Sequence, residues 1–148
     1  MILLQANTDT PESGLPSLPQ AMLAVSTALD KKAEDVVLLD ISSVSIMADF
    51  FMICTARTDT HARAVRDSVT QALEQAGLKM RRREGSDASG WVLLDWGDIV
   101  VHIFGPSERE FYSLEKLWGD ARVIAHVIAS LPHQKVYLKS DSLPHVVR

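Results

Sequence analysis

The 148-residue sequence predicts one α/β domain, a mixed sheet of about five strands with helices packed on it. Two apolar runs, residues 36–41 and 50–55, are rich in β-forming residues. The second run is apolar almost throughout, which is typical of a central strand that is buried on both faces. A third observation is the Gly97-Asp98 pair between two further apolar runs. It predicts a β-hairpin over residues 91–104, because glycine accepts the positive φ of a tight turn.

Helical periodicity predicts the layer that covers this sheet. Apolar residues recur at helical spacing after Ser17 and Gln20, which have the spacing of a capping box, and predict a helix from residue 17 to about residue 32. A second apolar stripe predicts a helix over residues 60–76 that ends at Gly77. Both helices need a partner for their apolar side, and the sheet provides one.

The middle of the chain predicts shorter elements. Residues 78–83 predict a short strand, and residues 84–90 predict a loop. Ser107 and Glu110 form a second capping-box pair, so we expect a helix to begin near Glu108.

The C-terminal part predicts one more helix, over residues 123–131, which Pro132 ends. Residues 135–139 are able to pair as an edge strand. The polar N-terminus has no apolar period and is expected to be disordered. We accordingly divide the chain into a disordered leader (1–16), a folded domain (17–120) and a C-terminal helix and tail (121–148).

Composition restricts the classes of partner. The net charge of −4 disfavours a broad phosphate-binding surface and favours a basic protein partner. The single cysteine, Cys54, excludes an intrachain disulfide and is expected to be a buried small hydrophobe. No stretch is apolar enough for a signal peptide or a membrane span, so we expect a cytoplasmic protein.

Alternation along the predicted hairpin sorts its side chains onto two faces. If Gly97 and Asp98 form the turn, Leu93 lies opposite His102. One face is wholly apolar and is expected to belong to the core: Val92, Leu94, Trp96, Ile99, Val101 and Ile103. The other combines large apolar groups with an acid and an imidazole: Trp91, Leu93, Asp95, Val100, His102 and Phe104.

Three interpretations of this mixed face are open. It resembles a protein interface, since Trp91 supplies contact area and an N–H donor. In the second interpretation the face is catalytic, because Asp and His are residue types that serve as general acid and base. Alternatively, the face is a second core face, with His102 hydrogen-bonded to Asp95. Catalysis is the weakest of the three, because the pair lacks a nucleophile or a further ligand. From the residues alone, a protein interface and a second core face are about equally favoured.

Metal and nucleotide sites find little support. The five histidines form no i, i+4 pair and there is no second cysteine, so the spacing of a zinc site is not met. Asp95 and Asp98 diverge across a tight turn, which makes them poor joint magnesium ligands. No glycine-rich segment matches a phosphate-binding loop. We therefore expect no metal and no cofactor.

Four segments, in this order and spacing, resemble the ribosomal silencing factor family, also called the Iojap-like family: DKKAEDVVLLDIS, ADFFMICTA, GWVLLDWGDIVVHIFG and EREFYSLEKLW. The resemblance covers roughly residues 20–120, and the last two segments are specific. Residues 56–61 depart from the small and hydroxyl residues that relatives carry there, and Ser113 stands where many have Asp. These departures affect the expected loop contacts.

The resemblance implies a nucleotidyltransferase-like fold without enzymatic activity. It implies binding to the large ribosomal subunit through its ribosomal protein fourteen, a steric block of joining with the small subunit, repression of translation, and a homodimer in isolation. A large-subunit assembly factor and a magnesium-dependent nucleotidyltransferase-like enzyme are the alternatives. By position, the resemblance carries over these partner-binding residues: Trp91, Asp95, Gly97, Asp98, His102, Tyr112, Glu115, Leu117 and Trp118.

A local basic cluster remains, formed by Lys79, Arg81, Arg82 and Arg83. Such residues on a short strand usually protect a sheet edge against aggregation. The functional alternative is a minor contact with ribosomal RNA phosphate.

Overall fold

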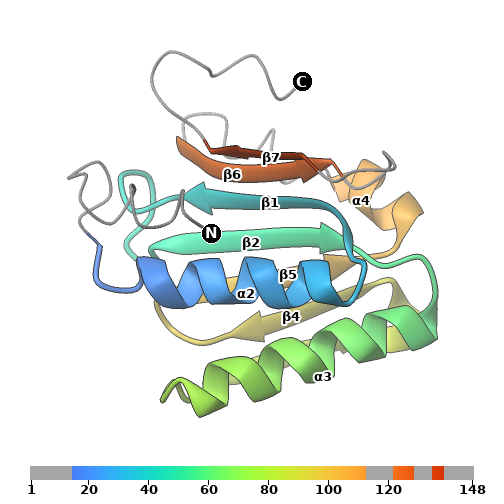
Figure 1. Cartoon of the computed structure of the whole chain (residues 1–148). Coiled ribbons are helices and arrows are strands. Elements are labelled where there is room, and N and C mark those ends of the chain that lie inside the picture. Colours follow the sequence, from blue (N-terminus) through green and yellow to red (C-terminus); the bar gives the residue numbers. More distant parts are fainter. Residues whose placement is uncertain (1–14, 113–121, 129–134, 139–148) are drawn as a thin grey trace.

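The computed structural model describes residues 15–112, 122–128 and 135–138 (Figure 1). Within these residues the strands form one mixed sheet of seven in the order β3-β4-β5-β2-β1-β6-β7. The α/β class is confirmed, and the sheet is wider than the five strands expected. The described elements are α2 (Leu18–Asp30), β1 (Glu34–Asp40), β2 (Phe50–Thr55), α3 (Asp59–Gln75), β3 (Arg82–Ser86), the 3₁₀ turn η2 (Asp87–Ser89), β4 (Trp91–Asp95), β5 (Ile99–Phe104), α4 (Pro106–Tyr112), β6 (Arg122–Ile128) and β7 (Lys135–Leu138).

One parallel pair lies in the middle of this sheet. β2 runs parallel to β5, from Phe50 opposite Ile99 to Thr55 opposite Phe104, and the other described pairs are antiparallel. Because a parallel connection needs a crossover, the chain between these strands contains α3 and the β3–β4 pair. The carboxyl ends of β2 and β5 therefore meet at one edge, where α3 and α4 begin.

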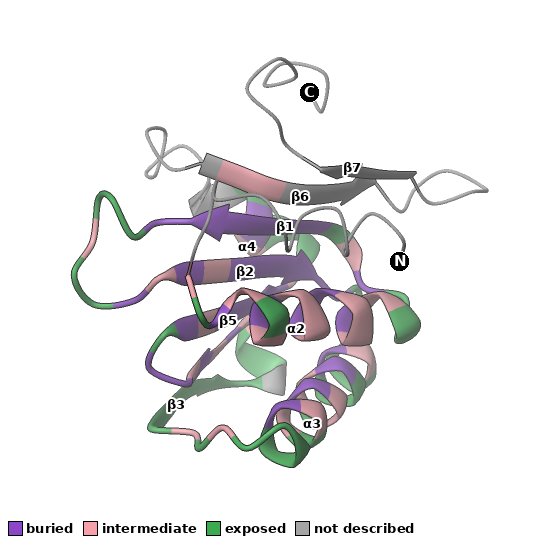
Figure 2. Ribbon diagram, turned by 60° about the vertical axis from the view of Figure 1, so that its left-hand side comes forward, coloured by how far each residue is buried: buried purple, intermediate pink, exposed green. Residues whose placement is uncertain are grey.

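The two long helices cover one face of the sheet. Figures 1 and 2 show α2 and α3 side by side on that face, with α4 behind the strands. The large core lies between this helix layer and the sheet, and includes the apolar stripe predicted for α3 (Ala62, Val65, Val69 and Leu73). A smaller apolar cluster lies on the opposite face, with Val37, Leu39, Ile53 and Phe104 among its members. The sheet is thus apolar on both faces.

The helix starts differ from the capping boxes that the sequence suggests. Ser17 precedes α2, but its side chain donates to Asp49 Oδ2 (3.3 Å) and makes no cap. Its backbone (φ −85°, ψ 0°) is not extended, so the hydroxyl does not face the first-turn N–H groups. A side-chain cap is present at the start of α3, where Thr58 Oγ1 accepts from His61 N at 3.0 Å. α4 begins at Pro106, two residues before Glu108, since proline suits the first position of a helix. Ser107 therefore lies inside the helix and not at its cap.

The strand predicted over residues 78–83 is shifted towards the C-terminus. β3 occupies residues 82–86, so the first part of the predicted loop 84–90 belongs to the sheet and its remainder to η2. Among the described strands β3 pairs only with β4, and every one of its residues is exposed. It is an edge strand without apolar alternation, so the sequence pattern predicted its bounds poorly.

The helix predicted over residues 123–131 is wrong over its described part, which is strand β6. β6 pairs with β1 on one side and with β7 on the other. The segment RVIAHVI is rich in β-branched residues, and the free edge of β1 supplies the hydrogen bonds that decide between helix and strand. β7 confirms the expected edge strand. None of the described helices is long and apolar enough to cross a lipid bilayer.

Gly85 provides a test of the β3–β4 connection. Its φ is +81°, and a Cβ at this position would overlap the carbonyl oxygen of Trp91. We expect Gly85→Ala to lower the free energy of unfolding by roughly 2–5 kcal/mol, through the left-handed backbone and the overlap together. Urea-induced unfolding measures this. Gly77→Ala is the control, because φ is +95° there but nothing lies within 4 Å, so only ~1–2 kcal/mol is expected. Equal losses in the two variants would contradict the overlap argument.

Candidate functional site

The β4–β5 hairpin has the register that a two-residue turn predicts. Trp91 lies opposite Phe104, Leu93 opposite His102, and Trp96 N donates to Ile99 O at 2.8 Å. The predicted core face is confirmed, because all its side chains are at most 4% exposed: Val92, Leu94, Trp96, Ile99, Val101 and Ile103.

The mixed face carries a cluster of aromatic rings. The Trp91 and Phe104 rings stack with their centroids 5.7 Å apart, and the His102 ring is nearly parallel to both, at 6.1 Å from Trp91 and 6.0 Å from Phe104. Phe51 of β2 meets His102 edge-on at 4.7 Å. Trp91 is half-buried, whereas His102 and Phe104 are buried. The part of the cluster that reaches solvent therefore includes the indole of Trp91, which is the expected behaviour of an interface anchor.

A hydrogen bond joins two of these rings. Trp91 Nε1 donates to His102 Nδ1 at 3.2 Å. An indole N–H only donates, so Nδ1 must be the unprotonated nitrogen and the proton of the neutral ring lies on Nε2. The bond between His102 and Asp95, which belongs to the interpretation as a second core face, is absent from the described contacts. Asp95 lies opposite Val100, one diagonal away from His102.

Burial sets the protonation state of His102. The side chain is 4% exposed, and its burial lowers the pKa to about 4. The imidazole is therefore neutral at physiological pH and is not poised for proton transfer. Its Nε2 is buried, and within the described part of the chain it has no hydrogen-bond partner. The acid–base interpretation of this face is not supported by this geometry.

The turn residues lie at the other end of the hairpin. Asp95 Oδ1 accepts from Gly97 N at 2.8 Å, which closes the turn, and the Asp95 carboxylate lies 3.7 Å from Arg82 Nε. Gly97 has a φ of +93° and lies under the guanidinium of Arg81. The Asp98 carbonyl accepts from two backbone N–H groups at the start of β2. Six residue steps, roughly 20 Å, separate Gly97 of this turn from Trp91. The structure thus brings Trp91 and His102 together and sets the predicted turn residues apart from them.

The predicted residues of the following helix fall at the limit of the described chain. Tyr112 is the last residue of α4, and Glu115, Leu117 and Trp118 lie outside the described residues. Arg109, which the sequence did not suggest, fixes α4 to the sheet. It is 8% exposed and donates to the Asp35 carbonyl (2.8 Å) and Thr55 Oγ1 (3.1 Å). A lone arginine in a short polar helix gives no sequence signal of such burial.

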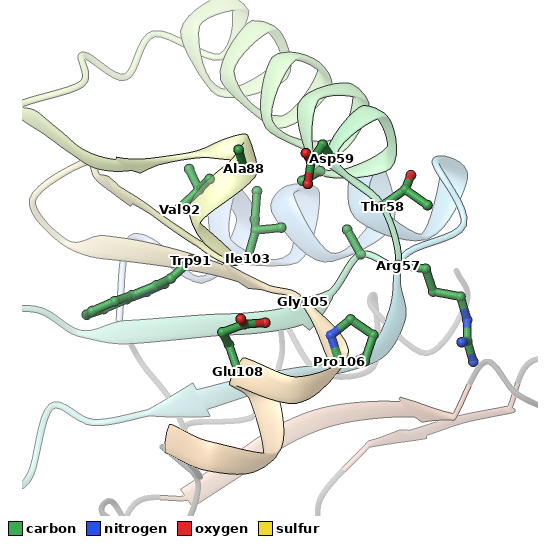
Figure 3. A pocket seen from close by; sticks show the side chains of 13 residues that line it. Arg57, Thr58, Asp59, Ala88, Trp91, Val92, Ile103, Gly105, Pro106 and Glu108 are labelled. Carbon is green, nitrogen blue, oxygen red and sulfur yellow. The ribbon is translucent and has the colours of Figure 1, made fainter.

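A pocket of about 160 Å³ lies where the carboxyl ends of β2 and β5 meet (Figure 3). Figure 3 shows the Glu108 carboxylate beside Pro106 and near Gly105, with the Trp91 side chain extending away from the pocket. Glu108 lies against Gly90 and Gly105, where any Cβ would overlap it. Asp59 is a second carboxylate on the lining, so the pocket is unfavourable for phosphate.

Other chemistry finds no support in the described residues. They contain no group of three or more His, Cys, Asp or Glu side chains placed to hold a metal ion. Cys54 is buried as expected, and desolvation raises the pKa of its thiol to about 12, so it is unreactive. What the hairpin offers is an aromatic surface.

His102 makes a pH-dependent contribution to stability. Its pKa is lower in the folded state (about 4) than the ordinary 6.5, so the unfolded chain binds more protons between these values and stability falls as the pH falls. We expect this one group to remove on the order of 3 kcal/mol between pH 7 and pH 4. Urea unfolding of the wild type and His102→Phe across this range isolates the contribution. Parallel pH profiles for the two proteins would show that the group does not titrate in this way.

Comparison with known proteins agrees with this architecture. The family described as "Ribosomal silencing factor during starvation" matches residues 15–143. The chain is 43% identical to a ribosomal silencing factor of Halalkalibacterium halodurans over 69% of this chain and 87% of that protein. It is 41% identical to one of Bacillus subtilis, over 67% and 84%.

A solved structure has a similar fold. The crystal structure of a Chromobacterium violaceum protein aligns with a TM-score of 0.68 and 31% identity, over 71% of this chain and 88% of that one. Sequence and fold therefore agree, and the chain belongs to the ribosomal silencing factor family.

Proposed function

We propose that this protein acts by binding and not by catalysis, and that the hairpin face around Trp91 docks on ribosomal protein fourteen of the large ribosomal subunit. The bound domain occupies space that the small subunit requires, so subunit joining is blocked and translation is repressed. The observation that carries the proposal is the half-buried Trp91, held on an aromatic face in a domain of this family. We also propose that the free protein is a cytoplasmic homodimer.

The physical requirements of this mechanism are modest. Tryptophan is among the residues most often responsible for binding energy at protein interfaces, and a few such anchors in a patch of about 800 Å² per partner suffice for stable binding. The net charge of −4 complements a basic ribosomal protein and favours encounter with it. Steric exclusion needs no reactive group, which agrees with a neutral His102 and an unreactive Cys54.

The basic cluster adds a subordinate contact. Lys79, Arg81, Arg82 and Arg83 are all exposed on and before the edge strand β3. Arg82 is engaged by Glu84, and Arg81 lies over Gly97, next to the hairpin turn. If the hairpin docks on the large subunit, this edge is where a minor contact with ribosomal RNA phosphate would form. Its weight is small, since the protein as a whole is acidic.

The enzyme alternative rests on the pocket at the carboxyl ends of the parallel strands, a place where α/β folds often bind ligands. Nucleotide transfer requires carboxylates that converge on magnesium and donors that hold phosphate. The described lining provides Asp59 and Glu108 from separate helices, and Arg57 is bound to Glu34 at 2.8 Å. Magnesium-dependent nucleotide binding by the purified protein would favour the enzyme over our proposal.

Trp91→Ala tests the docking face. We expect this variant to lose co-sedimentation with purified large subunits, with an affinity at least about 30-fold lower, because the main apolar anchor is removed. Circular dichroism establishes that the variant is folded. Ile46→Ala is the control: it removes an exposed large apolar side chain from the β1–β2 loop, at the far end of the sheet, and should bind normally. A folded Trp91→Ala protein that still binds would refute the docking face.

A sucrose-gradient profile tests the mechanism. Adding the purified protein to ribosomal subunits under joining conditions should reduce joined ribosomes and place the protein with the large subunit. Co-migration with the large subunit while joining proceeds normally would contradict the steric block. Accumulation of immature large subunits in a deletion strain, with normal joining, would favour the assembly-factor alternative.

A further inference from the structure

The mixed face contains a polar group whose presence is costly. His102 is 4% exposed among aromatic rings, and its Nε2 is buried without a hydrogen-bond partner in the described part of the chain. Burial opposes its charged form and lowers the pKa to about 4. A phenylalanine has a similar shape and carries neither of these costs. The histidine must therefore supply something that an apolar ring does not.

What it supplies is an acceptor for Trp91. The Trp91 Nε1–H donates to His102 Nδ1 at 3.2 Å, and the neutral tautomer with its proton on Nε2 leaves Nδ1 free to accept. The same two rings are nearly parallel, at an interplanar angle of 16°, and Phe104 stacks against both. Stacking restrains the plane of the indole, and the hydrogen bond selects which edge of it faces the sheet. The indole is thus held in one orientation.

We propose that His102 is a positioning residue, which fixes the Trp91 indole in the orientation that docks and does not itself contact the partner. The proposal rests on the docking face proposed above and deepens it. His102 is buried beneath the surface that a partner reaches. The resemblance suggests it as a contact residue, and we assign it an indirect role instead. A side chain that is ordered before binding loses less conformational freedom when the complex forms, and affinity rises accordingly.

Two substitutions separate the acceptor from the ring. His102→Phe keeps an aromatic ring and removes the acceptor, and we expect it to weaken binding to purified large subunits by about three- to tenfold. His102→Asn removes the ring and places an amide oxygen close to the position of Nδ1, so we expect an affinity within about twofold of the wild type. If His102→Phe does not fold, His102→Leu takes its place, because it also lacks an acceptor.

The orientation itself has a spectroscopic signature. In the ¹H–¹⁵N spectrum of the full chain, the Trp91 indole signal is identified by its loss in Trp91→Phe. Its N–H should exchange slowly with solvent in the wild type and in His102→Asn, and faster in His102→Phe. Ile103→Val is the control for stability alone, since it trims a buried neighbour on the opposite face. It should change neither indole exchange nor binding.

The outcomes distinguish this inference from the docking proposal. If Trp91→Ala loses binding while His102→Phe binds like the wild type, the positioning role is overturned and the docking face stands. If His102→Asn is as weak as His102→Phe, the acceptor is not what matters and the inference fails. Full binding by Trp91→Ala would overturn both. Weaker binding by His102→Phe, near-wild-type binding by His102→Asn and matching changes in indole N–H exchange would support the positioning role.

Discussion

The register of the β4–β5 hairpin is the constraint on which the arrangement of this face depends. Side chains alternate along a strand, so a slip of one residue would move every core side chain to the other face. Gly97 at φ +93° and the hydrogen bond from its N–H to Asp95 Oδ1 fix the turn at two residues. The turn residues that the resemblance suggests as partner contacts therefore have a structural role, because they determine where Trp91 and His102 lie.

The sheet also explains why the mixed face is aromatic. It is covered by α2 and α3 on one side, and the opposite side carries a second apolar cluster built from β1, β2 and the hairpin. Stacked rings cover such a surface with large contact areas and few degrees of freedom. Arg109 anchors α4 to the same side through Thr55. The surface near Trp91 is thus bounded by α4 and the sheet, which contact each other through Arg109 and Thr55.

Local pattern predicted those parts of the fold whose signal is contained in neighbouring residues. Period-two alternation and a Gly-Asp turn were enough to give the hairpin pairing, and the stripe ending at Gly77 was enough to give α3. The segment of β6 is apolar and β-branched, but only the edge of β1 decides its state, and that edge is distant in the sequence. The hydrogen-bond partner of His102 could not be predicted for a similar reason. Trp91 and Asp95 are its two diagonal neighbours on β4, and alternation alone does not distinguish between them. The twist of the hairpin brings one diagonal closer.

The pocket and the hairpin face are two different candidate sites. The pocket lies where this kind of fold commonly binds ligands, and the hairpin face is where this chain carries its aromatic cluster. The carboxyl ends of parallel strands are a usual ligand site in α/β proteins. Here the Glu108 carboxylate lies against Gly90 and Gly105 at that edge, and the absence of both Cβ atoms is what makes room for it. Glu108 is also in the first turn of α4, where the helix dipole favours an acid. Part of the space at the strand ends is therefore filled by a side chain of the protein itself, beside the pocket of about 160 Å³. The docking surface that we propose is the face that Trp91 caps, and this proposal is argued from the side chains of that face and not from the fold.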